Sequence, residues 1–450
     1  MPDGHQLTAA DLDELARELD QLRAWVVGSL GESDARYIRR VVGAQRLLEV
    51  AARATMFVSF LPPAWIAGTL MLATAKILEN MELGHNVMHG QWDWMGDPRI
   101  HSSTWEWDFA SPSAQWRNAH NYRHHTYTNV LGKDRDIGFG ILRMTPGQRW
   151  HPAYLGQPLY NLVLAVTFEW GVAFFDTEID RAVSGDKSWR EARADVRAML
   201  RKAGRQGLKD YLLFPALAGP AFLPVFLGNL TANLIRNIWA HTVIFCGHFP
   251  EGAETFTEEQ TADESRGAWY LRQLRGSANI DGSPLLHIMT GNLSHQIEHH
   301  LFPDIPSNRY GQIAPQVRAL CERFGIPYTS GSLLRQAADH WARSLRLALP
   351  GPATASPTAP VEVTGPASST MAAAVTGVPA QGRVPRPKGA TELSRVRAAA
   401  RRDPQRRRPH AAESRLGLRR RGPAAAAQHE GSRRQAGRGL QSLLWWLAAH

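Results

Sequence analysis

The chain has 450 residues, enough for a sizeable core or for a membrane bundle with a soluble cap. It has 2 cysteines, Cys246 and Cys321, which exclude a disulfide framework and a cysteine-based zinc or iron–sulfur site. The formal net charge is +10, but residues 351–450 hold 17 Lys and Arg against 5 Asp and Glu, leaving 34 against 36 in residues 1–350. The basic character therefore belongs to the C-terminal segment, and no nucleic-acid partner is expected for the rest.

The N-terminal segment, residues 1–40, is predicted to be amphipathic and cytosolic. Residues 11–25 (DLDELARELDQLRAW) are charged and have helical periodicity. A basic start followed by an apolar stretch, which would indicate a signal peptide, is not found here.

Two long apolar blocks follow, each about twice the length of one membrane crossing. Residues 47–78 are interrupted by Pro62 and Pro63, where a helix stops or bends, so we expect a hairpin of two spans. Residues 211–249 predict a second hairpin with its turn near Gly228 and Asn229. The shorter apolar stretch at 159–175 is interpreted as a helix lying in the membrane interface. The alternative for all of them is buried core helices of a large soluble protein.

These elements predict an all-α fold: an integral membrane bundle of about four transmembrane helices with a cytosolic helical cap, over residues 41–345. The two expected turns carry no Lys or Arg, whereas the other loops carry nearly all of them. The positive-inside rule then places the large loops and both termini in the cytosol.

Residues 351–450 are predicted to be disordered, because they are rich in Pro, Ala and Arg and have no apolar periodicity. Binding to anionic lipid or nucleic acid is one interpretation of this tail, and a solvated tail without a specific role is the other.

Histidines gather in three short stretches on the same predicted side of the membrane. They are GHNVMHG at 84–90 with His85 and His89, HNYRHHTYTN at 120–129 with His120, His124 and His125, and SHQIEHHLFPDIP at 294–306 with His295, His299 and His300. On a helix, positions i and i+4 share one face, so each stretch can present a pair of imidazoles to one ion. We infer that the three stretches converge on a metal site.

Imidazole-rich coordination without thiolate suits iron, copper or zinc. The chain has no HExxH zinc motif. A carboxylate-type di-iron bundle needs two Glu-x-x-His motifs, and only Glu82 with His85 matches that pattern. A dinuclear iron site with nitrogen ligands remains.

The three stretches, with GKDRDIGFG after the second, resemble the three histidine boxes of the membrane fatty acid desaturases. The resemblance covers about residues 40–330 and is strongest to bacterial acyl-CoA or acyl-lipid desaturases with a glutamine in the third box. It implies a bundle of four spans in the bacterial inner membrane, with a di-iron site in the cytosolic cap. By position it implies these metal ligands: His85, His89, His120, His124, His125, His299 and His300.

Two choices among ligands stay open. In the third box, Gln296 matches the glutamine of the family branch, while His295 repeats the spacing of the second box, and both are kept as candidates. The family also uses a histidine between the second and third boxes. Either His241, with Asn237 one helical turn before it, or His248 fits, and the distance to the third box favours His248.

Carboxylates beside the boxes are candidates to orient the imidazole N–H groups, although capping or surface roles explain them equally well. They are Glu82, Asp134, Asp136 and Glu298, and Asn237 is a further polar candidate. Five tryptophans lie between the first two boxes, and we expect one or two to line an acyl tunnel; they are Trp92, Trp94, Trp105, Trp107 and Trp116.

The resemblance implies that two iron ions, O2 and two electrons remove two hydrogens from a fatty acyl chain carried by CoA or a lipid. No haem-binding HPGG motif and no dinucleotide-binding fingerprint is found, so we expect an external donor, a ferredoxin or a reductase carrying flavin or iron–sulfur. A lipid hydroxylase of the same architecture is one alternative. A membrane metal-binding or transport protein without redox chemistry is the other.

Overall fold

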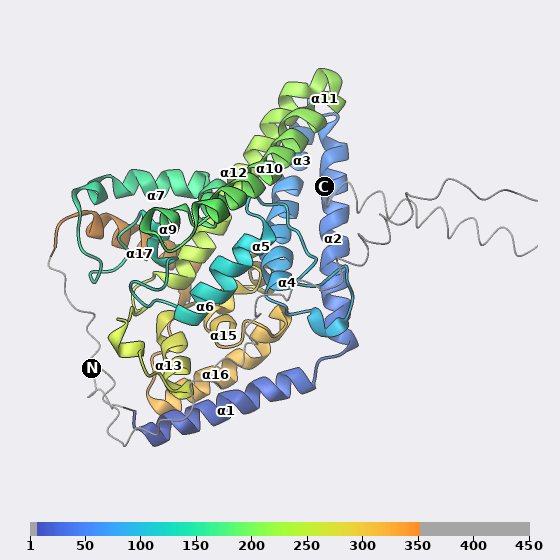
Figure 1. Cartoon of the computed structure of the whole chain (residues 1–450). Coiled ribbons are helices and arrows are strands. Elements are labelled where there is room, and N and C mark those ends of the chain that lie inside the picture. Colours follow the sequence, from blue (N-terminus) through green and yellow to red (C-terminus); the bar gives the residue numbers. More distant parts are fainter. Residues whose placement is uncertain (1–6, 352–450) are drawn as a thin grey trace, which may run out of the picture. The chain divides into compact units, whose positions relative to one another are not determined.

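The computed structural model describes residues 7–351, and this part of the chain is almost entirely helical (Figure 1). The α-helices are α1 (Ala9–Gly28), α2 (Glu32–Met56), α3 (Pro62–Leu78), α4 (Asn86–Met88), α5 (Ser113–Trp116), α6 (His125–Tyr127), α7 (Gln157–Val166), α8 (Phe168–Phe175), α9 (Ile179–Ser184), α10 (Trp189–Leu208), α11 (Phe214–Leu217), α12 (Phe222–His248), α13 (Arg266–Gly276), α14 (Pro284–Met289), α15 (Gln296–Leu301), α16 (Tyr310–Phe324) and α17 (Leu333–Ala348).

Short helical turns of other types link these helices. The π-helical turns are η1 (Glu79–His85), η3 (Arg117–His124) and η6 (Lys209–Leu213). The 3-10 turns are η2 (Asp93–Met95), η4 (Ile137–Gly140), η5 (Pro152–Gly156), η7 (Gly219–Ala221), η8 (Glu259–Thr261), η9 (Leu293–His295) and η10 (Ser307–Arg309). Two short strands, β1 (Asn279–Asp281) and β2 (Ser330–Ser332), pair in parallel.

The hairpin predicted in the first apolar block is present as α2 and α3. Helix α3 begins with Pro62 and Pro63 in its first turn, where a missing N–H costs nothing, and residues 57–61 form the connection. Helix α12 packs against α3, so that α2, α3 and α12 run beside one another (Figure 1).

The turn predicted near Gly228 and Asn229 is wrong. Helix α12 continues through both residues, and the chain reverses earlier, at Gly219, whose φ of 55° is accessible to glycine at little cost. Gly228 instead allows close helix packing: a Cβ there would lie 2.8 Å from Cε of Met56 and 3.0 Å from Oγ1 of Thr69.

The apolar stretch at 159–175 forms two helices rather than the single interfacial helix expected. The axes of the segments 152–166 and 168–184 differ by 99°. The amide of Asn237 satisfies both sides of the break, since its Nδ2 donates to the Val166 carbonyl at 2.9 Å and its Oδ1 accepts from the Glu169 N–H at 3.4 Å. The bend is therefore fixed by a side chain from α12, which no local pattern reveals.

The N-terminal helix α1 packs on the C-terminal third of the described chain. Its apolar face, with Leu12, Leu15 and Leu19, is buried in one hydrophobic cluster with residues of α13, α15 and α16. The N-terminal segment predicted to end at residue 40 has no structural break there, because helix α2 runs through that residue without interruption. The structure therefore closes the cap over the third histidine stretch with a helix that is remote in sequence (Figure 1).

Within residues 7–351, no individual helix combines the length and apolar composition that mark a membrane crossing. The bent pair formed by segments 152–166 and 168–184 meets those criteria by length and composition only. The predicted disordered tail at 351–450 lies outside the described residues, apart from residue 351.

Candidate metal centre

The first two histidine stretches lie on π-helical turns rather than on regular α-helix. His85 ends η1 and His89 follows α4, while η3 contains His120 and His124 and leads directly into His125. Single π-helical turns within α-helices often accompany functional sites, because the wider turn changes the direction of the side chains. The α-helical angles assumed from the sequence are therefore only approximate here.

Eight imidazoles from the three stretches and from the end of α12 meet in the interior. One group consists of His85, His89, His120 and His299, and a second of His124, His248 and His300; within each group the candidate ligand nitrogens lie within 4.8 Å of one another. His125 links the two, because its ring stacks on His300 at 4.5 Å and its Nε2 lies 3.3 Å from Nε2 of His120.

The distances between the imidazole nitrogens agree with coordination of a shared metal ion better than with hydrogen bonds between the rings. Nε2 of His85 lies 3.2 Å from Nε2 of His299. Two ligand nitrogens at about 2.1 Å from one ion would be separated by about 3.0 to 3.4 Å at cis or tetrahedral angles. Within the described chain, the buried Nε2 atoms of His89, His124 and His300 have no hydrogen-bond partner. Buried polar atoms without partners are costly, so the arrangement indicates a cation among these nitrogens.

Carboxylates from the loop after the second box orient two of the rings. Nδ1 of His124 lies 3.1 Å from both oxygens of Asp134, and Asp136 approaches Nδ1 of His120 at 3.5 Å. An Nδ1–H that donates to a carboxylate leaves Nε2 unprotonated and able to bind a metal. The loop holds Asp134 itself in place, since its oxygens accept from the N–H groups of Asn129 at 2.7 Å and of Asp136 at 3.0 Å.

Three neutral partners of the third box were not anticipated. Tyr310 lies 3.1 Å from Nδ1 of His299 and donates its own hydroxyl to the Phe302 carbonyl, so its oxygen is free to accept from His299. Nδ1 of His300 lies 3.2 Å from Oε1 of Gln273 and 3.2 Å from Oγ1 of Thr128. Only Thr128, three positions after His125 and four after His124, gives a sequence signal, because it lies inside the second histidine stretch at 120–129.

The structure leaves His241 and His295 outside the cluster. His241 lies 2.9 Å from Oδ1 of Asn161 and stacks on Phe245, about two helical turns before His248. His295 packs against His287, with 4.6 Å between ring centroids. The positions that do reach the cluster are His248 and Gln296, whose Nε2 atoms lie 3.1 Å apart. The buried Oε1 of Gln296 has no partner among the described residues.

Three of the predicted orienting residues do not contact an imidazole. Glu82 accepts hydrogen bonds from Tyr37, Ser307 and Asn292, and so ties η1 to α2 and to the loop after the third box. Glu298 accepts from Asn279 and Tyr328 beside β1. Asn237 holds the α7–α8 bend described above. These three residues, although next to the boxes in sequence, hold the surrounding helices and loops together and do not orient the imidazole rings.

Burial determines the protonation of most of the imidazoles. It lowers the pKa of His85, His89, His125, His299 and His300 well below the usual range, and neighbouring imidazoles lower each pKa further. Burial also lowers the pKa of His124, but Asp134 and Asp136 outweigh it and the net shift is upwards. Neutral imidazoles at neutral pH are the form that binds metal.

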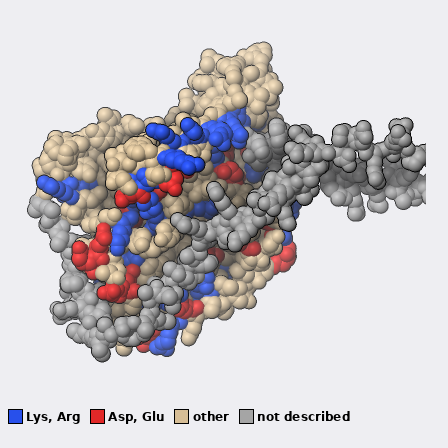
Figure 2. Space-filling model, in the orientation of Figure 1, with Lys and Arg blue, Asp and Glu red and all other residues tan. Residues whose placement is uncertain are grey.

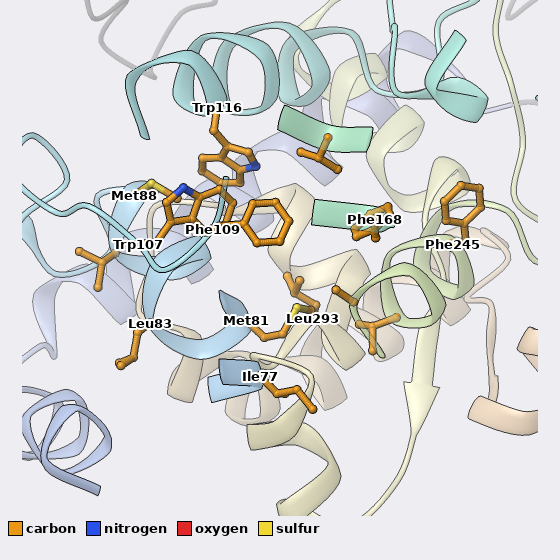
Figure 3. Packing of buried hydrophobic residues seen from close by; sticks show 14 of the residues in the cluster. Ile77, Met81, Leu83, Met88, Trp107, Phe109, Trp116, Phe168, Phe245 and Leu293 are labelled. Atoms are coloured by element: carbon orange, nitrogen blue, oxygen red, sulfur yellow. The ribbon is translucent and has the colours of Figure 1, made fainter. Parts of the chain in front are cut away.

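An apolar pocket opens beside the first group of histidines. It encloses about 680 Å³ of empty space, including the part open to solvent, and its wall includes His85, His120 and His248. Figure 3 shows Trp107, Phe109 and Trp116 gathered at this place, with Phe168 nearby. Trp116 also stacks on His120, with 4.5 Å between ring centroids. The remaining lining residues are mostly apolar: Met81, Ala119, Phe139, Val172, Phe175, Ala240, Ile244 and Phe249, with Asn80, Asp136 and Asp176.

The fold and the site define a class of protein: a helical protein with a histidine-lined candidate dinuclear metal centre and an adjoining apolar pocket. The family model described as fatty acid desaturase matches residues 61–332. The NADPH-dependent stearoyl-CoA 9-desaturase of Mycobacterium tuberculosis (strain ATCC 25618 / H37Rv) is 51% identical over 348 residues, 76% of this chain and 82% of the relative. The sn-1 linoleoyl-lipid 6-desaturase of Synechocystis sp. (strain ATCC 27184 / PCC 6803 / Kazusa) is 29% identical over 286 residues, 60% of this chain and 78% of the relative.

The chain belongs to the fatty acid desaturase family. It is an oxidoreductase that desaturates fatty acyl chains, and the resemblance drawn from the histidine boxes is confirmed. The candidate metal-binding groups agree with this activity, since all of them lie within the matched residues.

Proposed function

We propose that this protein is an acyl-CoA desaturase that binds two iron ions through its clustered imidazoles and works at the cytosolic face of a membrane. The observation that carries the proposal is the convergence of eight histidines beside an apolar pocket. The relative with 51% identity is named a stearoyl-CoA 9-desaturase, which makes a saturated long-chain acyl-CoA the substrate to test first.

The metal-binding roles are divided between the two histidine groups. His85, His89, His120 and His299 would hold one iron ion, and His124, His248 and His300 the other, with His125 between them and Gln296 beside His248. The iron ions, with O2 and two electrons, would supply the oxidant that an unactivated methylene requires. Asp134, Asp136, Tyr310 and Gln273 keep the rings oriented so that the unprotonated nitrogens point inward.

The pocket would hold the acyl chain so that one pair of carbons lies next to the histidines. Trp107, Phe109 and Phe168 provide apolar wall, and Trp116 contacts both the pocket and the His120 ring. Restricting an acyl chain to one register is what selects a single carbon pair for reaction.

The electrons come from outside the chain in this proposal. The relative's name includes NADPH dependence, and residues 1–450 contain no dinucleotide-binding fingerprint, so a separate ferredoxin or a reductase with flavin or iron–sulfur would transfer them. Two electrons and two protons, with one O2, balance the removal of two hydrogens from the acyl chain and the release of two waters.

Insertion in the bacterial inner membrane, with the metal centre and both termini in the cytosol, is part of the proposal. Residues 54–75 and 211–235 contain no Asp, Glu, Lys or Arg. Large apolar side chains there are exposed, among them Phe60, Ile66, Leu217 and Leu223. Exposed apolar surface without charge favours lipid over water as its environment.

Product analysis in a host that expresses the chain tests the proposed activity. We expect a new monounsaturated fatty acid, with the double bond at carbon 9, and two iron ions per purified chain. Labelled O2 separates the hydroxylase alternative, because oxygen-18 enters a hydroxy lipid but not an alkene. A purified chain that turns over without iron would exclude the proposed centre, and a chain that binds metal without changing any lipid would favour the non-catalytic alternative.

A further inference from the structure

Helix α10 carries a row of five exposed arginines, here called the arginine stripe: Arg190, Arg193, Arg197, Arg201 and Arg205. Their spacing of three or four residues places them on one face of the helix. From the first to the last the row extends about 22 Å along the helix axis. It is therefore a continuous cationic surface rather than five separate charges.

The stripe faces away from the protein. The opposite face of α10 is buried through Ala192, Met199 and Ala203. None of the five arginines has an ion-pair partner among residues 7–351, whereas cap arginines such as Arg272 and Arg309 are paired with Glu264 and Asp34. Like charges at spacings of i and i+4 repel one another, so a row without acidic partners among residues 7–351 is stabilised by binding an anionic group.

The position of α10 narrows the choice of partner. The helix continues through η6 into α11 and the segment 211–235, which has no charged residue and exposes Leu212, Leu213 and Leu217. Figure 2 shows Lys and Arg atoms along the path of α10, at the base of a projecting end whose visible face has no charged atoms. The stripe therefore borders the most apolar surface visible on this part of the molecule.

Apolar and aromatic side chains accompany the arginines. Trp189, Leu200 and Leu208 are exposed on α10 itself, at fractions of 50%, 59% and 56%. Helix α8, which packs against α10, exposes Trp170 and Phe174. Arginine mixed with tryptophan and leucine at the edge of an apolar surface is typical of the level of lipid headgroups. A soluble acidic protein would match the charges but not the exposed leucines.

We propose that the arginine stripe of α10 binds the headgroups of anionic phospholipids at the cytosolic membrane surface. The proposal rests on the membrane insertion proposed above, and adds to it a preference for one class of lipid. Arginine binds phosphate oxygens in a bidentate manner. The stripe therefore suits anionic headgroups, in which no positively charged group of the lipid itself compensates the phosphodiester. The positions next to α11, Arg197, Arg201 and Arg205, should contribute most.

The test measures which lipids remain with the full chain after gentle detergent extraction from bilayers of phosphatidylcholine with one-fifth phosphatidylglycerol. We expect the wild type to retain phosphatidylglycerol enriched several-fold over the bilayer. The triple variant R197Q/R201Q/R205Q should lower that enrichment at least threefold, because each arginine near an anionic surface multiplies lipid affinity about fivefold. High salt should lower the wild-type enrichment as well.

The matched control removes three positive charges elsewhere, in R36Q/R39Q/R40Q on α2, where all three arginines are exposed. All variants keep the basic tail, so its contribution to lipid binding is constant. Equal enrichment in the wild type and the α10 variant, with an unchanged thermal midpoint, would overturn the proposal. So would an equal loss in the control, which would indicate net charge alone.

Two further results separate other partners and the parent proposal. Loss of affinity for an acidic electron donor in the α10 variant, with lipid enrichment retained, would assign the stripe to that protein instead. A chain that leaves membranes without detergent would overturn both membrane insertion and the lipid site. The desaturase assignment would be unaffected, since it is tested separately by iron content and product analysis.

Discussion

At the residue scale, the centre consists of imidazoles whose outer nitrogens are fixed by different partners. Asp134 contacts His124, Tyr310 contacts His299, and Gln273 contacts His300. Each partner fixes which nitrogen carries the proton, and this decides which nitrogen faces the cluster. Each of the two histidine groups therefore contains one ring beside a carboxylate, His120 or His124, and one ring beside a neutral acceptor, His299 or His300.

His124→Ala should abolish desaturation and remove at least half of the bound iron, because His124 belongs to three of the candidate ligand groups. His295→Ala should retain iron and product, since the His295 ring packs against His287 instead. Metal analysis of both purified variants, with gas chromatography of the lipids, makes the comparison. Iron loss in His295→Ala together with full loading of His124→Ala would contradict the arrangement.

Tyr310→Phe removes the hydroxyl that accepts from Nδ1 of His299 and keeps the aromatic ring of residue 310. We expect iron affinity to fall about 10- to 100-fold, the range for losing a partner of a ligating histidine. Competition with an iron chelator measures the affinity directly. Tyr328→Phe is the matched control, because the hydroxyl of Tyr328 donates to Glu298 and contacts no imidazole; similar losses in both variants would argue against a specific role for Tyr310.

At the element scale, buried ion pairs hold the helices behind the pocket together. Lys76 on α3 contacts Asp210 on η6 at 2.8 Å and Asp108, in the loop before α5, at 2.7 Å. Arg53 on α2 binds the same Asp210 at 3.0 Å. Ionisable groups among apolar helices are stable only when they are paired in this way. The mutual pairing explains how charged side chains are accommodated between the apolar blocks.

Lys76→Met should destabilise the fold by about 3 to 5 kcal/mol, because it removes the cation shared by the buried carboxylates of Asp108 and Asp210 and leaves each with one positive partner fewer. The measurement is the free energy of unfolding, or the thermal midpoint, of the protein in detergent. Lys133→Met is the control, since its pair with Glu258 is partly exposed and its loss should cost less than about 1 kcal/mol. A midpoint unchanged by Lys76→Met would show that the network contributes little to stability.

At the scale of the whole molecule, the pocket exists only because segments remote in sequence enclose it. Its wall combines Met81 on η1, Trp116 on α5, Val172 on α8 and Ala240 on α12. The histidine groups are assembled from an equally wide range of the chain. The pocket and the metal centre share His85, His120 and His248, so a chain bound in the pocket contacts the centre directly.

Ala240→Phe should shorten the acyl chains that the protein accepts, because the larger ring occupies pocket volume. We expect about a tenfold or greater loss of desaturation for an 18-carbon acyl-CoA, since small misplacements at a reacting centre are costly, and a smaller loss for shorter chains. Rates with acyl-CoA substrates of graded length give the profile. Ala338→Phe, on the exposed face of α17, should leave the profile unchanged, and equal losses at every chain length would place Ala240 outside the acyl site.

Much of this protein was predictable from local patterns. The helical class, the break at Pro62 and Pro63, the family and the convergent histidines all follow from residue type and spacing, because backbone geometry alone decides which neighbouring side chains leave a helix together. Local patterns also misplaced the turn at Gly228, because a glycine that permits close helix packing cannot be distinguished in sequence from a glycine that permits a turn.

Only the tertiary structure decided which helix faces meet. The choice of His248 over His241 depends on the rotation of α12 against α8 and α17, and the position of Gln296 depends on how η9 turns the chain after His295. The bend held by Asn237 and the orientation of His299 by Tyr310 likewise join residues far apart in the chain. Spacing determines what a single helix presents, whereas packing between helices determines what the presented groups can reach.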